Sequence, residues 1–399
     1  MTHRVRRRVV VVQPYLPGYR TRFFEHAHEH LDSQRVTLEV VHGPPPPGQD
    51  ARQDAATCSC ATQVPTTRLL TLGGRSLAWH QVSRRTASAD AVVLEQALHS
   101  LEAFPLALRQ AIWRGRQRAH APRVAFWGHG RTYTRSANPL ETRVKDALTR
   151  QGSWFFAYTP GGAAHVVSRG FPRDRITVVR NSVDTSALIR TRDRASRPGT
   201  AEQAQAVALR QRYGLTPGRT ALFLGGLDAP KRIAFLLDAA RRVADELPGF
   251  RLLVAGEGAD RDLVDAAARA GGPVVPLGRV TGPHTALLGT VSDVMLMPGR
   301  VGLCAVDSFA LRTPIITTDW PWHAPEFEYL ADGRNALVVP DDPGAYSRAV
   351  TTLLRDADRL ASLRAACERH AAEYTIEGMA ARFSDGVLRL LAEKTGGDD

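Results

Sequence analysis

The stretch LFLGGLDAPKRIAFLLDAA, residues 222–240, decides the fold class of this 399-residue sequence. An apolar run ends at Leu224, and a glycine-rich loop follows with Gly225 and Gly226. A segment compatible with a helix then extends over Lys231–Glu246. A strand, a short loop and a helix in this order form the repeating unit of an α/β domain with a parallel sheet.

The same alternation of short apolar runs and helix-compatible segments continues along the whole chain. In the first half the expected strands are Arg8–Val12, Leu38–His42, Ala91–Leu94, Arg123–Trp127, Trp154–Tyr158 and Ile176–Arg180. In the second half they are Thr220–Leu224, Arg251–Ala255, Val274–Leu277, Asp293–Met297, Pro314–Thr318 and Ala336–Val339. These runs are continuously apolar, which is typical of parallel strands that are covered on both faces. The sequence therefore predicts an α/β fold.

The length predicts two domains, because one hydrophobic core rarely serves so many residues. A polar stretch without a strand signal interrupts the pattern before residue 214. We therefore expect a first domain at residues 1–185, a linker at 186–213 with a helix that leads into the second domain, a second domain at 214–375 and a C-terminal helix at 376–399 that packs on the first domain. Two stretches of the first domain, His42–Asp54 and Thr71–Arg85, are expected to be flexible loops beside a ligand cleft.

The composition limits the partners. The net charge of +12 arises from 52 basic and 40 acidic residues, and it suits anionic partners such as nucleotide diphosphates or an anionic membrane surface, or simply a solvated basic surface. Only 7% of the residues are aromatic, and no basic stretch is interleaved with aromatic residues, so nucleic-acid binding is not expected. No apolar run is long enough to span a membrane, and the N-terminus does not match a signal peptide. We expect a cytoplasmic protein.

The four cysteines, Cys58, Cys60, Cys304 and Cys367, lack the companion residues of a zinc site. In a chain of this length they are interpreted as free thiols in a reducing compartment, and no bound metal is expected.

Several motifs occur in an order that resembles the family 4 retaining glycosyltransferases. Besides residues 222–240, the second half contains LLVAGEGADRDLV at 252–264, LGRVTG at 277–282, MLMPGRVGLCAVDSFALRTPIITTD at 295–319 and FEYLADGRNALVV at 327–339. The first half contains VVVVQPYLPGYRTRFFEHA at 9–27, FWGHG at 126–130 and ITVVRNSVD at 176–184. The resemblance covers most of the chain and implies the GT-B fold. In that fold two Rossmann-like domains face each other across a cleft, and a C-terminal helix crosses back to the N-terminal domain.

The resemblance implies that Lys231 binds the diphosphate of a nucleotide-sugar donor, close to a helix N-terminus that favours negative charge. The glycine-rich loop with Gly225 and Gly226 would approach the same diphosphate, and Arg232 would assist Lys231. The family usually has an arginine five residues before this lysine, and this chain has Gly226 there.

A second departure concerns the pair of glutamates that the family separates by seven residues. Asp307 occupies the second position and would hold the ribose hydroxyls, whereas the first position is Gly299. We interpret this loss as altered recognition of the sugar, with impaired catalysis as the alternative. The backbone amides of Val301, Gly302 and Leu303 are expected to contact the sugar instead.

The remaining candidates lie around the donor and the acceptor. His129, within FWGHG, is predicted to contact the donor sugar or the acceptor. Gly18 would allow the backbone to approach the diphosphate, and Arg20 would meet a phosphate or an acidic acceptor group. The backbone at Arg279 and Val280 is placed by the resemblance against the nucleotide base.

The sequence thus predicts a metal-independent, retaining glycosyltransferase that moves a sugar from a nucleotide-diphosphate sugar to a hydroxyl acceptor, with His129, Lys231 and Asp307 at the reaction centre. The acceptor would be a lipid-linked saccharide, a cell-surface glycan or a natural product, and peripheral membrane binding would suit the basic chain. Two alternatives stay open: a nucleotide-sugar epimerase of the same fold, and a catalytically silent nucleotide-sugar-binding subunit.

Overall fold

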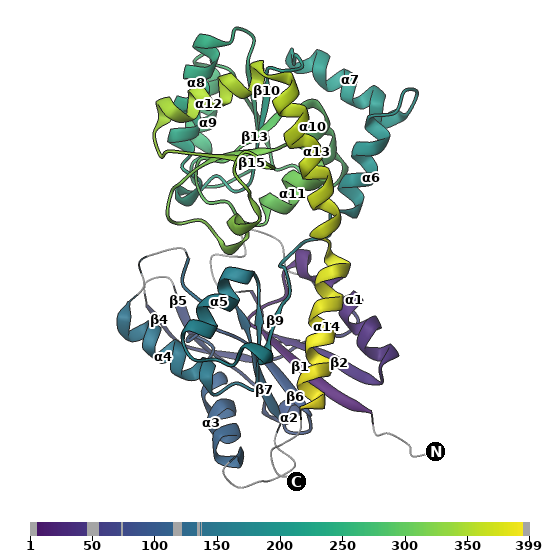
Figure 1. Cartoon of the computed structure of the whole chain (residues 1–399), viewed down its shortest axis with the longest axis vertical. Coiled ribbons are helices and arrows are strands. Elements are labelled where there is room, and N and C mark those ends of the chain that lie inside the picture. The colour runs from purple at the N-terminus through teal and green to yellow at the C-terminus, as the bar shows by residue number, and fades with distance from the viewer. Residues whose placement is uncertain are drawn as a thin grey trace. The chain divides into compact units, whose positions relative to one another are not determined.

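The computed structural model of the chain describes residues 6–45, 56–72, 75–114, 122–133, 136 and 138–393. The chain divides into two compact units. Unit 1 consists of Met1–Asp184 and Ile376–Asp399, and unit 2 consists of Thr185–Thr375. Each unit contains one parallel sheet with helices packed around it (Figure 1).

The sheet of unit 1 has seven parallel strands in the order β3-β2-β1-β6-β7-β8-β9. These strands are β1 (Arg7–Gln13), β2 (Val36–His42), β3 (Ala61–Gln63), β6 (Ala91–Glu95), β7 (Arg123–Gly128), β8 (Trp154–Ala157) and β9 (Ile176–Val178). The helices of the unit are α1 (Gly18–Ser33), α2 (Ser83–Thr86), α3 (Ala103–Arg114), α4 (Pro139–Arg150), α5 (Pro160–Ser168), η2 (Arg173–Arg175) and α14 (Ile376–Ala392). Every strand expected in the first half of the chain is present in this sheet.

Strand β1 shows why the expected strands are continuously apolar. Val9 and Val11 belong to the cluster that includes buried residues of α1 and α14, whereas Val10 and Val12 belong to the cluster on the other face of the sheet. All four side chains are buried because both faces of the sheet are covered. In this way α14 packs against α1 and becomes part of unit 1 (Figure 1).

The expectation of a loop at Thr71–Arg85 is wrong, because β4 (Thr66–Leu72) and β5 (Arg75–His80) form an antiparallel hairpin. The hairpin is attached to the segment after β6: the Ala78 N–H donates to the His99 carbonyl, and the buried His80 ring contacts Glu102 at 2.9 Å. The expected loop at His42–Asp54 falls mostly outside the described residues.

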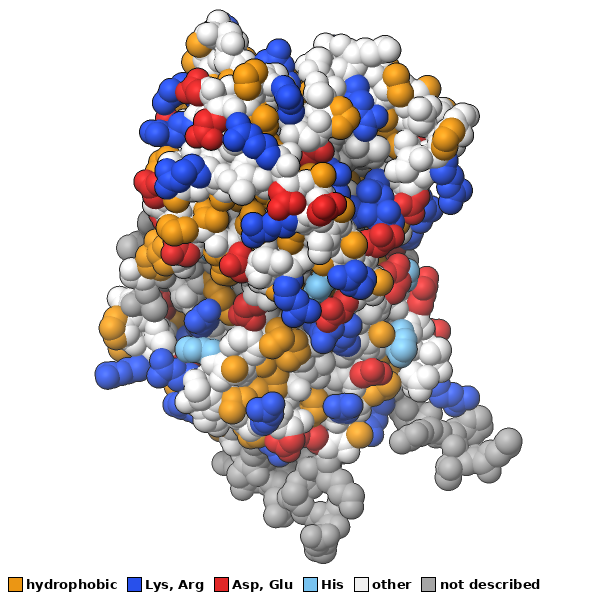
Figure 2. Space-filling view, turned by 45° about the horizontal axis from the view of Figure 1, so that its top comes forward, with side chains coloured by type: hydrophobic (Ala, Val, Ile, Leu, Met, Phe, Trp, Pro, Cys, Tyr) orange, Lys and Arg blue, Asp and Glu red, His pale blue; other side chains and the backbone are white. Residues whose placement is uncertain are grey.

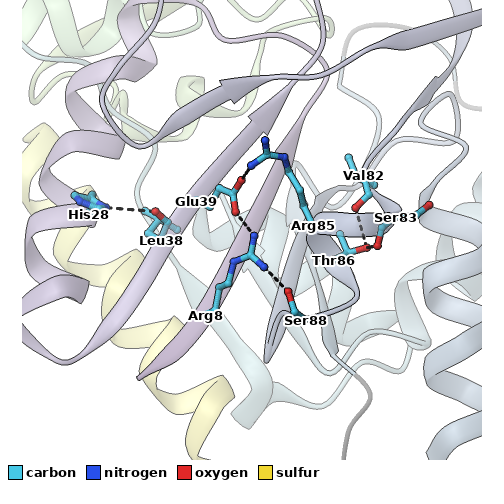
Figure 3. A network of polar contacts seen from close by, with 9 residues as sticks. All are labelled: Arg8, His28, Leu38, Glu39, Val82, Ser83, Arg85, Thr86 and Ser88. Atoms are coloured by element: carbon cyan, nitrogen blue, oxygen red, sulfur yellow. Dashed lines mark hydrogen bonds and ion pairs between the residues drawn. The ribbon is translucent and has the colours of Figure 1, made fainter. Parts of the chain in front are cut away.

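A polar network ties β1 and β2 to the short helix α2 (Figure 3). Glu39 on β2 pairs with both Arg8 on β1 and Arg85 on α2, and Arg8 also donates to the Ser88 hydroxyl. The Glu39 side chain is only 13% exposed, so its two arginine partners compensate for the loss of hydration. We interpret this network as structural.

The sheet of unit 2 has six parallel strands in the order β12-β11-β10-β13-β14-β15. These strands are β10 (Thr220–Leu224), β11 (Arg251–Ala255), β12 (Val274–Gly278), β13 (Val294–Leu296), β14 (Ile315–Thr318) and β15 (Ala336–Val339). The helices are α6 (Ser186–Ala195), α7 (Ala201–Tyr213), η3 (Ala229–Lys231), α8 (Ile233–Glu246), α9 (Arg261–Arg269), α10 (Pro283–Val291), α11 (Cys304–Leu311), η4 (Pro325–Tyr329), α12 (Pro343–Arg355) and α13 (Ala357–Glu373). The strands predicted for the second half all lie in this sheet.

The expectation of a linker at 186–213 is corrected by the structure. These residues form α6 and α7, which belong to unit 2 and pack against α10. Ala195 and Ala206 are buried in the core of unit 2. The stretch looked like a linker because small alanines, rather than large apolar residues, make these contacts.

Each sheet has a topological switch point, where successive connections leave in opposite directions. In unit 1 it lies between β1 and β6, and in unit 2 between β10 and β13. Ligands of open α/β sheets bind outside the carboxyl ends of the strands at such points. The loops after these four strands are therefore the places to look for a site.

On the face drawn in Figure 2, basic side chains are interspersed with acidic ones, so the positive excess forms no single band there. Among the described helices, none has the length and apolar character needed to cross a bilayer.

Candidate functional site

The loop after β10 places Lys231 at the switch point of unit 2. Gly225 leaves the strand in the left-handed region, with φ +155°, and the short helix η3 then ends at Lys231. Arg232 is also left-handed, with φ 57°, and turns the chain into α8. Positive φ angles are unfavourable for residues other than glycine, and residues in such strained conformations often occur in functional loops.

Lys231 joins this loop to the one that follows β13. Its Nζ donates to the Arg300 carbonyl at 2.6 Å and lies 3.8 Å from the Met297 sulfur. A β-carbon on Gly225 would lie 3.7 Å from the same Nζ, so the ammonium group is packed against this glycine. The expected neighbours Gly225 and Lys231 are thus brought together.

Arg232 is held differently from Lys231. Its guanidinium pairs with Asp341 and lies over the ring of Phe235, 4.5 Å from the centroid. A longer contact of 5.7 Å reaches the ring of Trp320. The arginine is therefore already engaged by a carboxylate, and its expected role beside Lys231 stays a prediction.

The structure gives a physical reason for the glycine at position 299. A β-carbon there would lie only 2.4 Å from the Pro230 carbonyl oxygen and 2.7 Å from that of Lys231. The next residue strengthens this approach, since the Arg300 N–H donates to the Pro230 carbonyl at 2.8 Å. The two loops touch through their backbones, and no side chain fits between them without moving one loop.

The expected recognition by three backbone amides needs a correction at Val301. The Val301 N–H donates to Nδ1 of His323 at 3.0 Å, and Nε2 of that ring contacts the Thr318 carbonyl at 2.9 Å. These bonds fix a neutral imidazole, and burial lowers the pKa of His323 further. The Val301 amide is therefore occupied, whereas Gly302 and Leu303 precede α11, where backbone N–H groups have no acceptor within the helix.

Asp307 lies on α11 and its side chain is partly buried. Burial raises the pKa of this carboxyl to about 6, and the positive charge of Lys231 opposes that rise. The two side chains are thus close enough to interact electrostatically. Lys231, Asp307 and the start of α11 form a combination that can hold a phosphate together with hydroxyl groups.

Arg279 and Val280 line a pocket of about 450 Å³ at the edge strand β12. Its other walls come from α7 and α10, through residues such as Tyr213 and His284. The expected contact with a base through the backbone of Arg279 and Val280 stays a prediction.

In unit 1, the loop after β1 leads to Gly18, which begins α1, and to Arg20 in the first turn. The Arg20 side chain is buried, and its guanidinium lies 5.2 Å from the ring centroids of both Trp127 and Tyr158. A cation placed between aromatic rings is stabilised by their electron-rich faces. Arg20 is therefore a buried component of the switch point and not an exposed phosphate ligand.

His129 follows β7, and close backbone contacts hold its loop in place. A β-carbon on Gly130 would lie 2.4 Å from the Gly162 carbonyl, so the loop touches the first turn of α5. The ring packs against Tyr158 with a centroid distance of 4.7 Å. Loss of hydration inside the protein is the main cause that lowers the pKa of His129, and the positive charges of Lys145 and Arg20 lower it further. The side chain keeps an exposed part, so a neutral imidazole is available to a ligand.

Two residues at the end of β6 escaped the sequence analysis. Gln96 is buried, accepts from the Gly130 N–H at 3.0 Å and donates to the Thr149 hydroxyl at 2.8 Å, which positions the His129 loop. Glu95 is the last residue of β6, and within the described part of the chain its buried Oε2 has no hydrogen-bond partner. Burial raises the pKa of Glu95, while His99, Arg20 and Lys145 oppose the rise. The sequence did contain a signal for Glu95, because this carboxylate stands at the end of an apolar strand, where ligands of α/β sheets bind.

Comparison with known proteins supports the interpretation of unit 2. The family model "Glycosyl transferases group 1" matches residues 218–356. Phosphatidyl-myo-inositol mannosyltransferase from Mycobacterium tuberculosis is 31% identical over 131 residues, which are 32% of this chain and 34% of that protein. D-inositol 3-phosphate glycosyltransferase from Thermobispora bispora is 30% identical over 236 residues, which are 55% of this chain and 52% of that protein. The matched regions thus span about a third to a half of these curated relatives.

The fold of the whole chain is also found in solved structures. Anabaena Alr3699/HepE, solved in complex with UDP, is similar with a TM-score of 0.64 and 14% identity, over 96% of this chain and all of that one. At this identity the likeness establishes the fold alone. Residues 218–356 thus match the glycosyl transferases group 1 family, and the chain has the GT-B fold.

Proposed function

We propose that the chain transfers a sugar from a nucleotide-diphosphate sugar to a hydroxyl acceptor, with retention of the anomeric configuration and without a bound metal. The observation that supports this most directly is the position of Lys231. Its ammonium group lies between Gly225 and the Arg300 carbonyl, beside the start of α11 and within electrostatic range of Asp307. A cation in this position can neutralise the charge that develops on a leaving diphosphate.

The residues of unit 2 would divide the donor between them. Lys231 would exchange its carbonyl partner for a phosphate oxygen, which is a stronger acceptor because it is charged. Asp307 would accept hydrogen bonds from the two ribose hydroxyls when it is ionised. Gly302 and Leu303 would offer backbone N–H groups to the sugar or the phosphate.

In the proposed step, the bond between the anomeric carbon and the diphosphate oxygen breaks, and the acceptor oxygen bonds to that carbon on the same face. The acceptor proton passes to the departing phosphate oxygen, so the step needs no protein base. His129 and Glu95 would orient hydroxyl groups on the acceptor side, because a neutral imidazole and a carboxylate are both good hydrogen-bond partners for them.

The first experiment identifies the donor. UDP, GDP and dTDP are each tested for their effect on the melting temperature, because a ligand of the folded state raises it. The corresponding sugar nucleotides are then incubated with an acceptor panel that includes myo-inositol, its 3-phosphate and phosphatidylinositol, since both curated relatives are named for inositol acceptors. We expect a glycosylated product and one free nucleoside diphosphate for each sugar transferred.

Lys231→Ala is expected to lower kcat/KM by about 10²- to 10³-fold, the range seen when one preorganised group at a developing negative charge is removed. Arg241→Ala is the matched control, because this exposed arginine on α8 removes the same charge outside the site. Formation of a donor epimer without free nucleotide would exclude the transferase. Donor binding without turnover with any acceptor in the panel would contradict the proposed reaction in favour of a silent subunit.

A further inference from the structure

A second basic residue, Arg300, is joined through its backbone to the Lys231 loop, and the family resemblance of the sequence implies no role for it. We propose that Arg300 binds the donor diphosphate and replaces in space the arginine that is absent at position 226. This inference rests on the proposed function, because it names a further binding residue of the same site and not a separate activity.

The backbone of Arg300 is fixed directly to the Lys231 loop. The Arg300 N–H donates to the Pro230 carbonyl at 2.8 Å, and the Arg300 carbonyl accepts from Nζ of Lys231 at 2.6 Å. Gly299 allows this arrangement, since a β-carbon there would collide with Pro230. The glycine at 299 therefore brings the residue after it next to the phosphate-binding lysine.

Asp228, which faces position 226, is also within electrostatic range of the Arg300 side chain. The guanidinium feels the negative charge of Asp228, and burial lowers the pKa of Arg300 while Asp228 opposes that change. A β-carbon on Gly226 would lie 3.4 Å from Oδ2 of Asp228. The Asp228 carboxylate is therefore a neighbour of position 226 and interacts electrostatically with the Arg300 guanidinium.

The chemistry of the guanidinium suits a diphosphate. Nε of Arg300 donates to the Trp322 carbonyl at 3.2 Å, which orients the planar group. A planar guanidinium can donate two parallel hydrogen bonds to phosphate oxygens, and it stays charged when partly buried. Lys231 would then act as a point charge, and Arg300 would provide the directional contact.

The test measures nucleotide affinity by calorimetry for Arg300→Ala and Arg300→Gln, using the nucleoside diphosphate that stabilises the wild-type protein best and its monophosphate. We expect the diphosphate to bind about 10- to 100-fold more weakly to both variants, because each loses a charged hydrogen-bond donor. The monophosphate should lose much less. Arg300→Lys should recover part of the affinity, and Arg241→Ala should bind like the wild type.

A second-site variant makes the test specific to the proposed replacement. The nearest atoms to a β-carbon at Gly226 lie at 3.4 to 3.9 Å, so the loop has room for a side chain there. Gly226→Arg combined with Arg300→Ala should regain at least several-fold of the lost diphosphate affinity. Thermal melting followed by circular dichroism shows whether each variant is folded. If Arg300→Ala does not fold, the affinity measurements are made with Arg300→Gln instead.

The outcomes separate the two proposals. If the wild-type protein binds no nucleoside diphosphate, the proposed function itself fails, and this inference fails with it. If the wild type binds but Arg300→Gln binds equally well, only the inference is wrong. Equal loss of monophosphate and diphosphate would also overturn it, because Arg300 would then act on the loop and not on the second phosphate.

Discussion

The switch points of unit 1 and unit 2 are built from the same topology but with opposite chemistry. In unit 2 the loops after β10 and β13 touch through glycine and carbonyl groups, and the basic Lys231 is held by a backbone oxygen. In unit 1 the corresponding position holds Arg20 beside aromatic rings and the buried Oε2 of Glu95, and a largely neutral His129 lies in the next loop, after β7. The first arrangement suits a phosphate, and the second suits hydroxyl groups.

The difference teaches how two similar sheets divide the work that we propose. A carbonyl is a weak partner for an ammonium group, so a phosphate can displace it at little cost. A cation enclosed by aromatic rings and a buried acid are costly to rearrange, because each would have to be hydrated or paired anew. Unit 2 is thus organised to exchange an anionic ligand, and unit 1 to keep a fixed set of polar contacts.

The largest expected effect comes from restoring the glutamate that the family would have at position 299. In Gly299→Glu the new β-carbon collides with the Pro230 carbonyl, so we expect a loss of about 1–3 kcal/mol in the free energy of unfolding, as for other overpacked sites. We also expect the nucleotide-dependent rise in melting temperature to disappear. Urea unfolding and thermal shift measure the two effects. Gly272→Glu, at an exposed position, is the control, and an active Gly299→Glu enzyme would contradict the close packing.

The second prediction concerns the pH dependence of donor binding through Asp307. Its pKa of about 6 means that the side chain becomes an ionised acceptor as the pH rises through 6, so nucleotide affinity should increase from pH 5 to pH 7. Asp307→Asn should bind about 10-fold more weakly at pH 7.5, with a flatter profile. Calorimetric titration from pH 5 to pH 8 tests this, with Asp262→Asn as the control. A wild-type affinity that falls between pH 5 and pH 7 would show that Asp307 is not the ligand.

The same pKa has a consequence for the stability of the unliganded protein, with the opposite sign. A carboxyl whose pKa is raised on folding stabilises the folded state most when it is protonated, and this contribution is lost as the pH rises from about 4 to 6. Asp307→Asn should therefore raise the free energy of unfolding at pH 7. We expect a gain below about 3 kcal/mol, since the side chain is only partly buried.

The smallest effect is expected in unit 1, for Glu95→Gln. If Glu95 orients an acceptor hydroxyl, the acceptor KM should rise about 2- to 10-fold, the value of one ordinary hydrogen bond. Nucleotide affinity should be unchanged, because the donor residues lie in unit 2. Initial rates at varied acceptor concentration measure the first quantity, and calorimetry measures the second. A change in nucleotide affinity without a change in acceptor KM would contradict the proposal that unit 2 binds the donor and unit 1 contacts the acceptor.

Much of the fold could be read from local pattern. The valines of β1 and the apolar run before Gly225 predicted buried parallel strands, because period and composition depend only on near neighbours in the chain. The hairpin β4–β5 was missed, and α6 and α7 were not assigned to unit 2, since these elements are stabilised by attachment to the segment after β6 and to α10. Both are cases in which tertiary contacts override a weak local signal.

The sequence by itself determined the α/β class, the succession of strands along the chain and the place of Lys231 and Asp307 after strands of unit 2. Only the tertiary structure decided why position 299 is glycine, which partner occupies the Val301 amide and how Glu95 and Arg300 are placed. The reason is physical: periodicity records which face of an element is buried, whereas the fit between two loops depends on backbone atoms that carry no sequence identity.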